Sequence, residues 1–406
     1  MEAAVDSRSK DFLKYAFDLF PDRDYLIVTQ PHTVPENALL SKFTLVPKTM
    51  QNTFSHVLYL IHRDYLLEQD VQVQRTIAAD FDQITDLLAS TQQEFSKESP
   101  DEIMSMFQMA TSQMDSPWLA YTARVEESII AAFLISKDVN LNYYVSHFHV
   151  QDQILMAEHD PKGHSRLVYS VINPIFEKST RFLLKELLRL AGKTCLYFEI
   201  NVKTVIPTIF HELVHIRSRR FPHFLDRKWD HERYDPQPEE GDPGIESAIP
   251  VDGKDRDPLD EAEAPFALCF TTKRLLSEPK ILKNSRVVVV GASDTGISFV
   301  EALLSISYLD FSNITLISPG GLPHHHVPEK KGNLKAYSTS YTSEELRKLM
   351  LESRIQVVDA RMTDIDRSDK NIILHNGRVI PYDTLVLAMG IQDQTLDSLK
   401  YISQGI

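Results

Sequence analysis

"VVVVGASDTG", residues Val287 to Gly296, decides the fold of the C-terminal third of this 406-residue chain. Consecutive valines are typical of a strand that is buried on both faces of a parallel sheet, because such strands carry apolar side chains at every position. A glycine ends the run, and the apolar pattern of 297–305 then predicts a helix. Apolar runs at 313–317, 356–360 and 384–388 predict further strands. Strands that alternate with helices indicate a parallel α/β sheet.

The same ten residues contain part of a dinucleotide-binding fingerprint. Its three glycines serve the tight turn, the approach of the pyrophosphate and the packing of the helix on the strand. Gly291 and Gly296 hold the first and third places, but Ser293 holds the middle one. Ser318 stands at the end of the second strand, where an acidic residue would bind the ribose hydroxyl. We therefore expect these four residues to form a vestigial FAD or NAD site without a resident cofactor.

The stretch "NIILHNGRVIPYDTLVLAMG", residues 371–390, predicts a hairpin that turns at Asn376-Gly377, followed by a buried strand. With its Tyr382-Asp383 pair it resembles the FAD/NAD-dependent pyridine-nucleotide oxidoreductases. The resemblance covers 286–406. It adds Gly390 to the vestigial site and implies a Rossmann-like, FAD/NAD-binding-type parallel sheet domain over 280–406. The redox CxxxxC pair of that family is not present. We expect a truncated, incomplete domain that cannot pass electrons between flavin and nicotinamide.

A second resemblance lies upstream. The stretch "RLVYSVINPIFEKSTRFLLKELLRLAGKTCLYFEINV", residues 166–202, resembles the strand–helix–strand core of the acyl-CoA N-acyltransferase fold. Active members have a glycine-rich loop before that helix, and its amides hold the CoA pyrophosphate. Here the corresponding stretch, Phe176–Arg181, has no glycine and carries Glu177, which would repel phosphate. The resemblance implies an acyltransferase-like α+β domain with a mixed sheet over 71–224, without activity. It also implies the C-terminal remnant of a similar domain over 1–70.

Negative charge is concentrated between these two parts. The chain has a net charge of −14, and Asp230–Glu263 alone holds 13 acidic and 3 basic residues. This segment is rich in Pro and Gly and poor in large apolar residues, so burial cannot offset the entropy cost of ordering it. We expect an acidic disordered linker over 225–279, with an acidic docking tail as the alternative. The chain has no basic segment of the kind that binds nucleic acid.

Composition also bears on membranes and on redox state. No window of about 18 residues is continuously apolar, and the N-terminus has no apolar segment of a signal peptide, so we expect no contact with a membrane. The two cysteines, Cys195 and Cys269, form no disulfide framework and suit a reducing cytoplasm.

The stretch "HELVH", His211 to His215, has the spacing that binds zinc when it lies on a helix, with Glu212 as the general base. The β-branched "TVIPTIF" before it and the arginines after it favour a strand, so we expect no metal. A zinc hydrolase with His231 or Glu232 as a third ligand remains the alternative. We interpret the histidines of "PHHHVP", residues 324–326, as part of an exposed loop.

The basic amphipathic stretch "KSTRFLLKELLRLAGK", residues 178–193, has the pattern of a calmodulin target, but its flanking strands favour a helix that packs on a sheet. The order of the segments resembles a family of axonemal proteins in the calmodulin- and spoke-associated complex at the base of a radial spoke. Membership implies a non-catalytic scaffold in the cytoplasm and cytoskeleton of the cilium and sperm flagellum, which supports their assembly and motility. Its partners would be axonemal and radial-spoke proteins, including a calmodulin-containing complex. The alternatives are a vestigial FAD/NAD sensor and the zinc hydrolase.

Overall fold

The computed structural model describes residues 3–32, 34, 37, 39–46, 56–91, 100–112, 116–156, 159–200, 208–219, 266–277, 280–323, 341 and 343–389. The chain forms two compact units. Unit 1 combines residues 1–66 with 278–406, and unit 2 comprises residues 67–277. Most of the predicted acidic linker, Gly390 and the 324–326 histidines lie outside the described residues.

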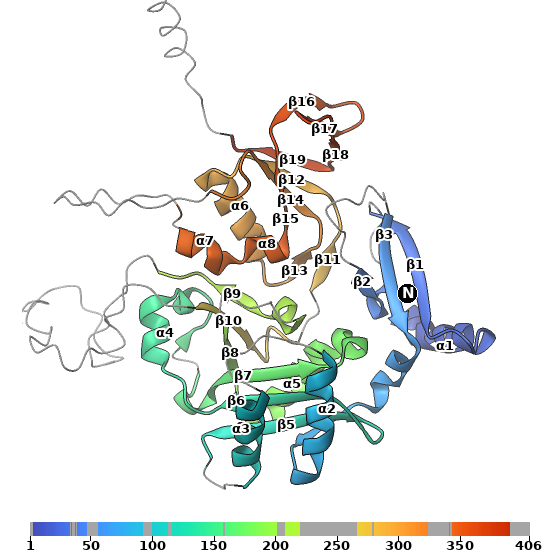
Figure 1. The fold of residues 1–406 in the computed structure, drawn as a ribbon, viewed down its shortest axis with the longest axis vertical. Helices are drawn as coiled ribbons and strands as arrows, with labels where there is room; N and C mark the ends of the chain where they lie inside the picture. The colour runs from blue at the N-terminus through green and yellow to red at the C-terminus, as the bar shows by residue number, and fades with distance from the viewer. Residues whose placement is uncertain are drawn as a thin grey trace, which may run out of the picture. The chain divides into compact units, whose positions relative to one another are not determined.

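Unit 2 is built on a seven-stranded mixed sheet (Figure 1). In spatial order the strands are β4 (Gln72–Arg75), β5 (Trp118–Val125), β6 (Ser128–Ser136), β7 (His164–Ile172), β8 (Cys195–Ile200), β10 (Ala267–Thr272) and β9 (Val214–Ile216). β7 and β8 run parallel, and the other neighbouring pairs run antiparallel. The mixed sheet predicted for this part of the chain is confirmed.

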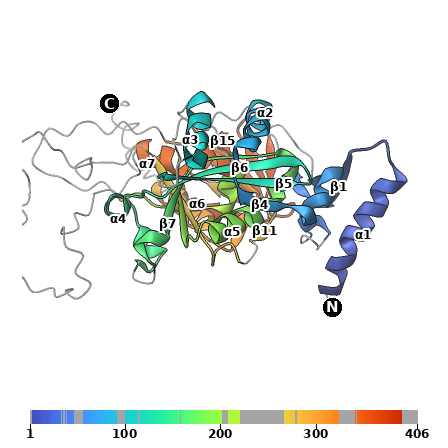
Figure 2. The same cartoon turned by 90° about the horizontal axis from the view of Figure 1, so that it is seen from below.

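Helices lie on both faces of this sheet (Figure 2). α2 (Phe81–Thr91) and α3 (Pro100–Ser112) bury Ile84 and Phe107 against β5, β6 and β7. On the opposite face lies α5 (Thr180–Leu190), whose apolar stripe is at most 1% exposed and consists of Leu183, Leu184, Leu187 and Leu188. Because that stripe is buried, the prediction of a sheet-packing helix is confirmed, and the stripe is not presented to calmodulin.

Strand β10 corrects the predicted extent of the linker. We expected disorder through residue 279, but Ala267–Thr272 forms a strand between β8 and β9. Leu268 and Phe270 are buried in one cluster with residues of α4 (Leu141–His147). The acidic composition ends at Glu263, and "FALCFTT" after it has the apolar and β-branched character of a strand. The prediction was wrong because it extended the character of the acidic segment across this boundary.

Unit 1 contains a four-stranded parallel sheet. Its spatial order is β15 (Gln356–Asp359), β14 (Ile314–Ser318), β12 (Val287–Val290) and β19 (Thr384–Leu387). Each neighbouring pair is parallel. These four strands were predicted from the valine run and the apolar runs that follow it, and they are confirmed.

The four valines of β12 serve two cores. Val287 and Val289 pack in a cluster with residues of α6 (Asp294–Leu304), α7 (Ser343–Leu349) and α8 (Leu351–Arg354). Val288 and Val290 point to the other face, where they cluster with Ile372. Successive side chains of a strand point to opposite faces, so a strand covered on both sides is apolar throughout.

On the face of the parallel sheet that carries Val288 and Val290 lies a three-stranded antiparallel sheet. It consists of β16 (Met362–Asp366), β17 (Asn371–Leu374) and β18 (Val379–Pro381). β17 and β18 form the predicted hairpin. Gly377 occupies the turn with a φ of +77°, in the left-handed region that favours glycine.

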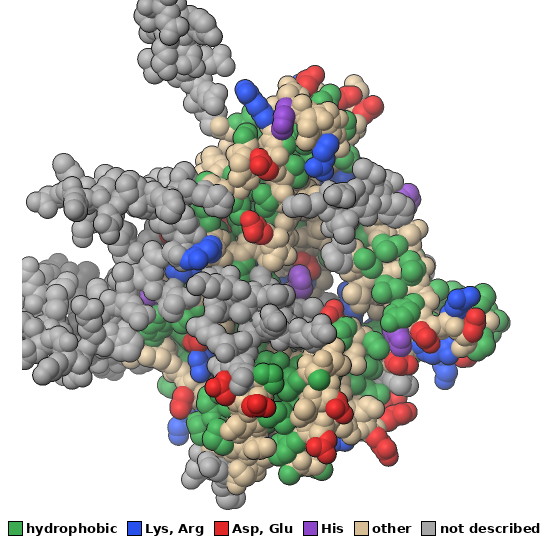
Figure 3. Space-filling model, in the orientation of Figure 1, with side chains coloured by type: hydrophobic (Ala, Val, Ile, Leu, Met, Phe, Trp, Pro, Cys, Tyr) green, Lys and Arg blue, Asp and Glu red, His purple; other side chains and the backbone are tan. Residues whose placement is uncertain are grey.

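The N-terminal part of unit 1 consists of α1 (Ala3–Leu19) and a three-stranded antiparallel sheet, in the order β1 (Tyr25–Pro31), β3 (His56–His62) and β2 (Thr44–Val46). A two-stranded parallel pair joins β11 (Ile281–Lys283) to β13 (Leu309–Phe311). The amide of Asn284 donates a 2.8 Å hydrogen bond to the buried Tyr59 hydroxyl of β3. Apolar side chains remain on the surface of the N-terminal part (Figure 3), among them Phe12, Tyr15, Tyr25 and Ile27.

None of the helices in the described ranges combines the length and the apolar character that a bilayer-spanning helix needs.

Candidate functional site

The turn after β12 is built around two glycines that leave no room for a side chain. Gly291 has a φ of +105°, and a Cβ at this position would lie 2.5 Å from the carbonyl oxygen of Ala388. A Cβ at Gly296, in the first turn of α6, would overlap the carbonyl oxygen of Gly291 and lie 3.3 Å from the Ala388 Cβ. Both glycines therefore allow the closest approach of β12, α6 and β19.

Ser293 caps the N-terminus of α6. Its Oγ accepts a hydrogen bond from the Gly296 amide at 3.3 Å and donates one to the Ala388 carbonyl oxygen at 2.6 Å. In a working dinucleotide turn, the amides of the first helical turn face the pyrophosphate. Here the chain's own hydroxyl takes one of those amides, and Asp294 places a carboxylate in the same turn. This charge is favourable to the helix dipole but opposes a bound phosphate.

The dinucleotide fingerprint places an acid at the end of β14. In this structure the acid lies at the end of the neighbouring strand, β15. Ser318 ends β14 and stands in register with Asp359, which ends β15. Asp359 Oδ1 accepts a hydrogen bond from the Gly320 amide at 2.6 Å. Sequence reasoning missed Asp359, because the fingerprint rule points only to the end of the second strand. The structure thus groups Gly291, Ser293 and Gly296 in one turn and places Ser318 at the end of the neighbouring strand.

The Tyr382-Asp383 pair lies at the opposite end of the sheet from the glycine turn. Asp383 precedes β19 and accepts three hydrogen bonds from Arg286, which precedes β12. His32 Nε2 lies 3.5 Å from the same carboxylate. Burial alone would raise the pKa of Asp383, but the side-chain and backbone hydrogen bonds from Arg286 and the charges of Arg286 and His32 lower it to about 2. Asp383 therefore joins the starts of β12 and β19.

We predict that Asp383→Asn destabilises the chain by about 1–2 kcal/mol at pH 7, after allowance for partial solvent screening. The pKa of Asp383 is depressed in the folded state, so its stabilisation is complete above the ordinary carboxyl pKa. It is lost as the pH falls from about 4 to about 2. Urea unfolding followed by circular dichroism should therefore show a gap between wild type and variant that narrows on acidification. A gap that stays constant between pH 7 and pH 3 would contradict this assignment.

The start of α5 in unit 2 is the helix terminus that the acyltransferase resemblance points to. A 3-10 helix, Pro174–Ser179, leads directly into α5, and the Thr180 amide donates to the Glu177 carbonyl oxygen. Arg181 Nη1 donates to Glu212 at 2.5 Å and Nη2 donates to the Leu275 carbonyl oxygen at 2.9 Å. Burial raises the pKa of the Glu177 carboxyl group. The stretch that the acyltransferase resemblance aligns with a glycine-rich loop is thus a 3-10 helix that leads into α5 and carries the acid Glu177.

"HELVH" does not form the helix that zinc hydrolases need. His211 lies in a 3-10 segment, Thr208–Glu212, whereas His215 lies on strand β9. His211 is exposed and His215 is buried. Glu212, the would-be base, is paired with Arg181. The strand predicted here is confirmed, and the alternative of a zinc hydrolase is wrong, because its ligands do not share one face of a helix.

No protein-family model matches this sequence. Solved structures with likeness to parts of the chain include a putative acetyltransferase of the GNAT family from Desulfovibrio desulfuricans, at 16% identity over 32% of this chain and 72% of that chain, with a TM-score of 0.24. A probable acetyltransferase from Staphylococcus epidermidis matches at 10% identity over 36% of this chain and 84% of that chain, with a TM-score of 0.25. Reduced Bacillus anthracis CoADR-RHD matches at 19% identity over 28% of this chain and 18% of that chain, with a TM-score of 0.19.

Among curated proteins, Cilia- and flagella-associated protein 61 of Tetrahymena thermophila is 44% identical over 401 residues. The match covers 99% of this chain and 23% of that relative. The chain therefore spans less than a quarter of the relative's length. Identity at this level over nearly the whole chain confirms the ciliary resemblance drawn from the order of its segments: this chain is homologous to one segment of cilia- and flagella-associated protein 61.

Proposed function

We propose that this chain is a structural, non-catalytic part of cilia and flagella. Its homology to a protein named for these organelles supports the location. The scaffold role rests on one observation: both places where an enzyme of these folds would hold phosphate are occupied by groups of the chain. In unit 1 the Ser293 hydroxyl takes the Gly296 amide and Asp294 adds an acid to the turn, and in unit 2 a 3-10 helix that carries Glu177 precedes α5.

The finer assignment is to the radial-spoke base. We propose that the chain acts within the calmodulin- and spoke-associated complex, among other axonemal proteins, and supports ciliary and sperm-flagellar assembly and motility. The Rossmann-like and acyltransferase-like folds would then provide surfaces to which other axonemal proteins bind.

The experiment that tests the scaffold role is capture from axonemal extract. The tagged 406-residue chain serves as bait, and a tagged acetyltransferase of similar size serves as the matched control. We expect radial-spoke proteins to be enriched on the chain by quantitative mass spectrometry. Equal recovery of axonemal proteins on the two baits would contradict the proposal.

A vestigial nucleotide sensor is the second candidate, because Gly291 and Gly296 leave no room for a side chain in the turn, as the first and third glycines of the fingerprint do. The two candidates differ in one measurable property, the affinity of the unaltered chain for FAD or NAD.

We predict no saturable binding of FAD, NAD or acetyl-CoA by the unaltered chain in the micromolar range, measured by isothermal titration calorimetry. Ser293→Gly removes the hydroxyl from the Gly296 amide, but Asp294 keeps its charge in the turn. We therefore expect the variant to gain less than about tenfold in affinity for either dinucleotide. Tight binding by the unaltered chain would favour the sensor over the scaffold. Tight binding by the variant alone would show that Ser293 by itself closes the site.

A further inference from the structure

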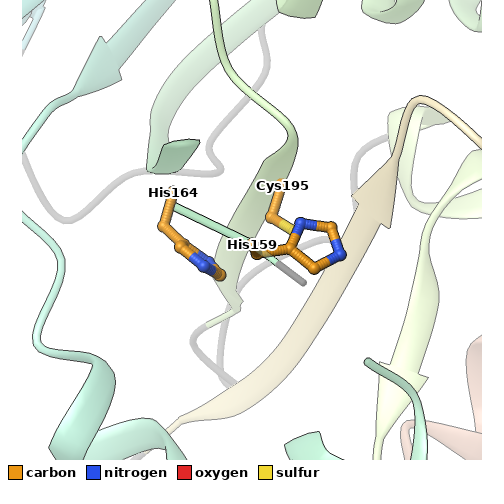
Figure 4. Close-up of side chains that lie close together, drawn as sticks. All are labelled: His159, His164 and Cys195. Atoms are coloured by element: carbon orange, nitrogen blue, oxygen red, sulfur yellow. The ribbon is translucent and has the colours of Figure 1, made fainter. Parts of the chain in front are cut away.

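His159, His164 and Cys195 lie together in unit 2 and take no part in the two turns described above (Figure 4). One ring nitrogen of each histidine and the Cys195 sulfur all lie within 4.8 Å of one another. The sulfur lies 3.3 Å from His159 Nδ1. Cys195 is fully buried, His164 is 2% exposed, and His159 is partly exposed.

The sheet brings these residues together. His164 opens β7 and Cys195 opens β8, and the two are partners in the register of this parallel strand pair. His159 comes from the loop just before a short 3-10 turn, Pro161–Gly163. The Thr194 amide donates to the Gly163 carbonyl oxygen at 2.7 Å, which joins that turn to the start of β8. A Cβ on Gly163 would lie 2.6 Å from Thr194 Oγ1, so a side chain there would require the Thr194 hydroxyl to move.

A neighbouring hydroxyl group orients the imidazole of His164. The hydroxyl of Tyr197, which is fully buried, lies 3.0 Å from His164 Nδ1, and the rings of the two residues are stacked. Ligating histidines in proteins are commonly oriented by a hydrogen bond to the ring nitrogen that does not bind the metal, and the Tyr197 contact to His164 Nδ1 is of this kind when His164 binds through Nε2. Thr194 Oγ1 lies 3.1 Å from His159 Nδ1, the nitrogen that also faces the Cys195 sulfur, so this contact would be given up when Nδ1 binds a metal.

We propose that His159, His164 and Cys195 form a zinc site. A thiolate with two imidazoles is a donor set that zinc prefers, and three protein ligands leave a fourth position for water. Around tetrahedral zinc, such donor atoms lie roughly 3.3–3.6 Å apart. The sulfur and His159 Nδ1 already stand at this spacing, so closure requires His164 and its neighbours to move by about 1 Å. On binding, the thiol proton passes to solvent.

The burial of the cluster argues against a nucleophilic role for the same residues. A cysteine–histidine pair that attacks a substrate needs an exposed sulfur, but Cys195 is 0% exposed. The partly exposed His159 instead provides a path for a small ion. This site is independent of "HELVH", on which the expectation of no metal was based.

The test uses the reduced, full 406-residue chain and Co²⁺ as a spectroscopic probe that Zn²⁺ then displaces. We expect about one Co²⁺ per chain, with a thiolate-to-metal charge-transfer band, and about one Zn²⁺ per chain by elemental analysis. Cys195→Ser should abolish the band, and His159→Gln should weaken binding at least tenfold. Cys269→Ser is the matched control, because Cys269 is also fully buried in the same sheet. His211→Ala controls for the other histidine motif.

Misfolding of a variant could also abolish metal binding. His159→Gln separates the two causes, because it changes a partly exposed side chain in a loop and should leave the fold intact. Circular dichroism should match wild type, while the rise in melting temperature that Zn²⁺ gives to wild type should disappear. The proposal is overturned if wild type binds no more Co²⁺ than Cys195→Ser. It is equally overturned if binding survives in Cys195→Ser and is lost in His211→Ala.

Discussion

Asp80→Ala should destabilise unit 2 by about 3–5 kcal/mol, the range for removing one partner of a buried ion pair. Asp80 is fully buried just before α2. Its carboxylate is paired with Arg124 of β5 and also accepts hydrogen bonds from Thr122 Oγ1 at 3.1 Å and from the Ile77 amide at 3.2 Å. Alanine would leave a largely buried guanidinium, a hydroxyl and an amide without this acceptor. The cost of that desolvation exceeds the loss of any single hydrogen bond.

Tryptophan fluorescence measures this effect in unit 2 alone. Both tryptophans of the chain, Trp118 and Trp229, belong to the 67–277 range. Urea unfolding followed at this signal should show a lower midpoint for Asp80→Ala. Asp86→Ala is the matched control, because Asp86 is an exposed acid on α2, the helix that Asp80 precedes. We expect the control to change the free energy of unfolding by no more than about 0.5 kcal/mol.

A double-mutant cycle separates the ion pair from the rest of the site. If Arg124 is the main partner, Asp80→Ala in the Arg124→Ala background should cost about 1–3 kcal/mol less than in wild type. Equal costs in the two backgrounds would show that the amide and hydroxyl bonds carry the effect. A cost for Asp80→Ala that is no larger than for Asp86→Ala would contradict the prediction altogether.

Patterns short enough to be read in one stretch of sequence predicted much of the fold. The valine run predicted β12 because every position of a doubly covered strand must be apolar. Asn376-Gly377 predicted a hairpin because that turn needs a positive φ, which Gly377 has. The cap that Ser293 forms on α6 is local, since its Oγ accepts from the Gly296 amide three residues on. Its second bond, to the Ala388 carbonyl oxygen 95 residues away in sequence, could not be predicted from the local pattern.

The features that sequence reasoning missed depend on strand register and distant pairing. His164 and Cys195 meet because β7 and β8 pair in one particular parallel register, and no motif spacing encodes that register. Asp80 and Arg124 are 44 residues apart, and each alone is an ordinary charged residue. β10 follows an acidic segment that lies outside the described part of the chain, so its place between β8 and β9 could not be predicted locally.

Gly296→Val should destabilise unit 1 by roughly 3 kcal/mol, at the upper end of the cost of overpacking. The reason is that the new Cβ would overlap backbone rather than a flexible side chain. The Gly291 carbonyl oxygen cannot turn away, because the amide of Gly291 is bonded to the Ile317 carbonyl oxygen at 2.8 Å and its neighbour Val290 is paired on both sides in the sheet. Relief therefore requires α6 to move off β12.

Hydrogen–deuterium exchange locates that movement. Peptides that contain β12 and β19 should lose protection in Gly296→Val, because both strands meet at this turn. Thr295→Val is the matched control, since Thr295 is the exposed neighbour on the same helical turn and the change adds the same side chain without the overlap. Gly320→Ala gives a second reference: its φ of +80° strains any side chain, yet nothing lies within 4 Å of the added Cβ. If peptides that contain β12 and β19 exchange as slowly in Gly296→Val as in Thr295→Val, the prediction is contradicted. That result would show that α6 and β12 do not make the close contact on which the turn depends.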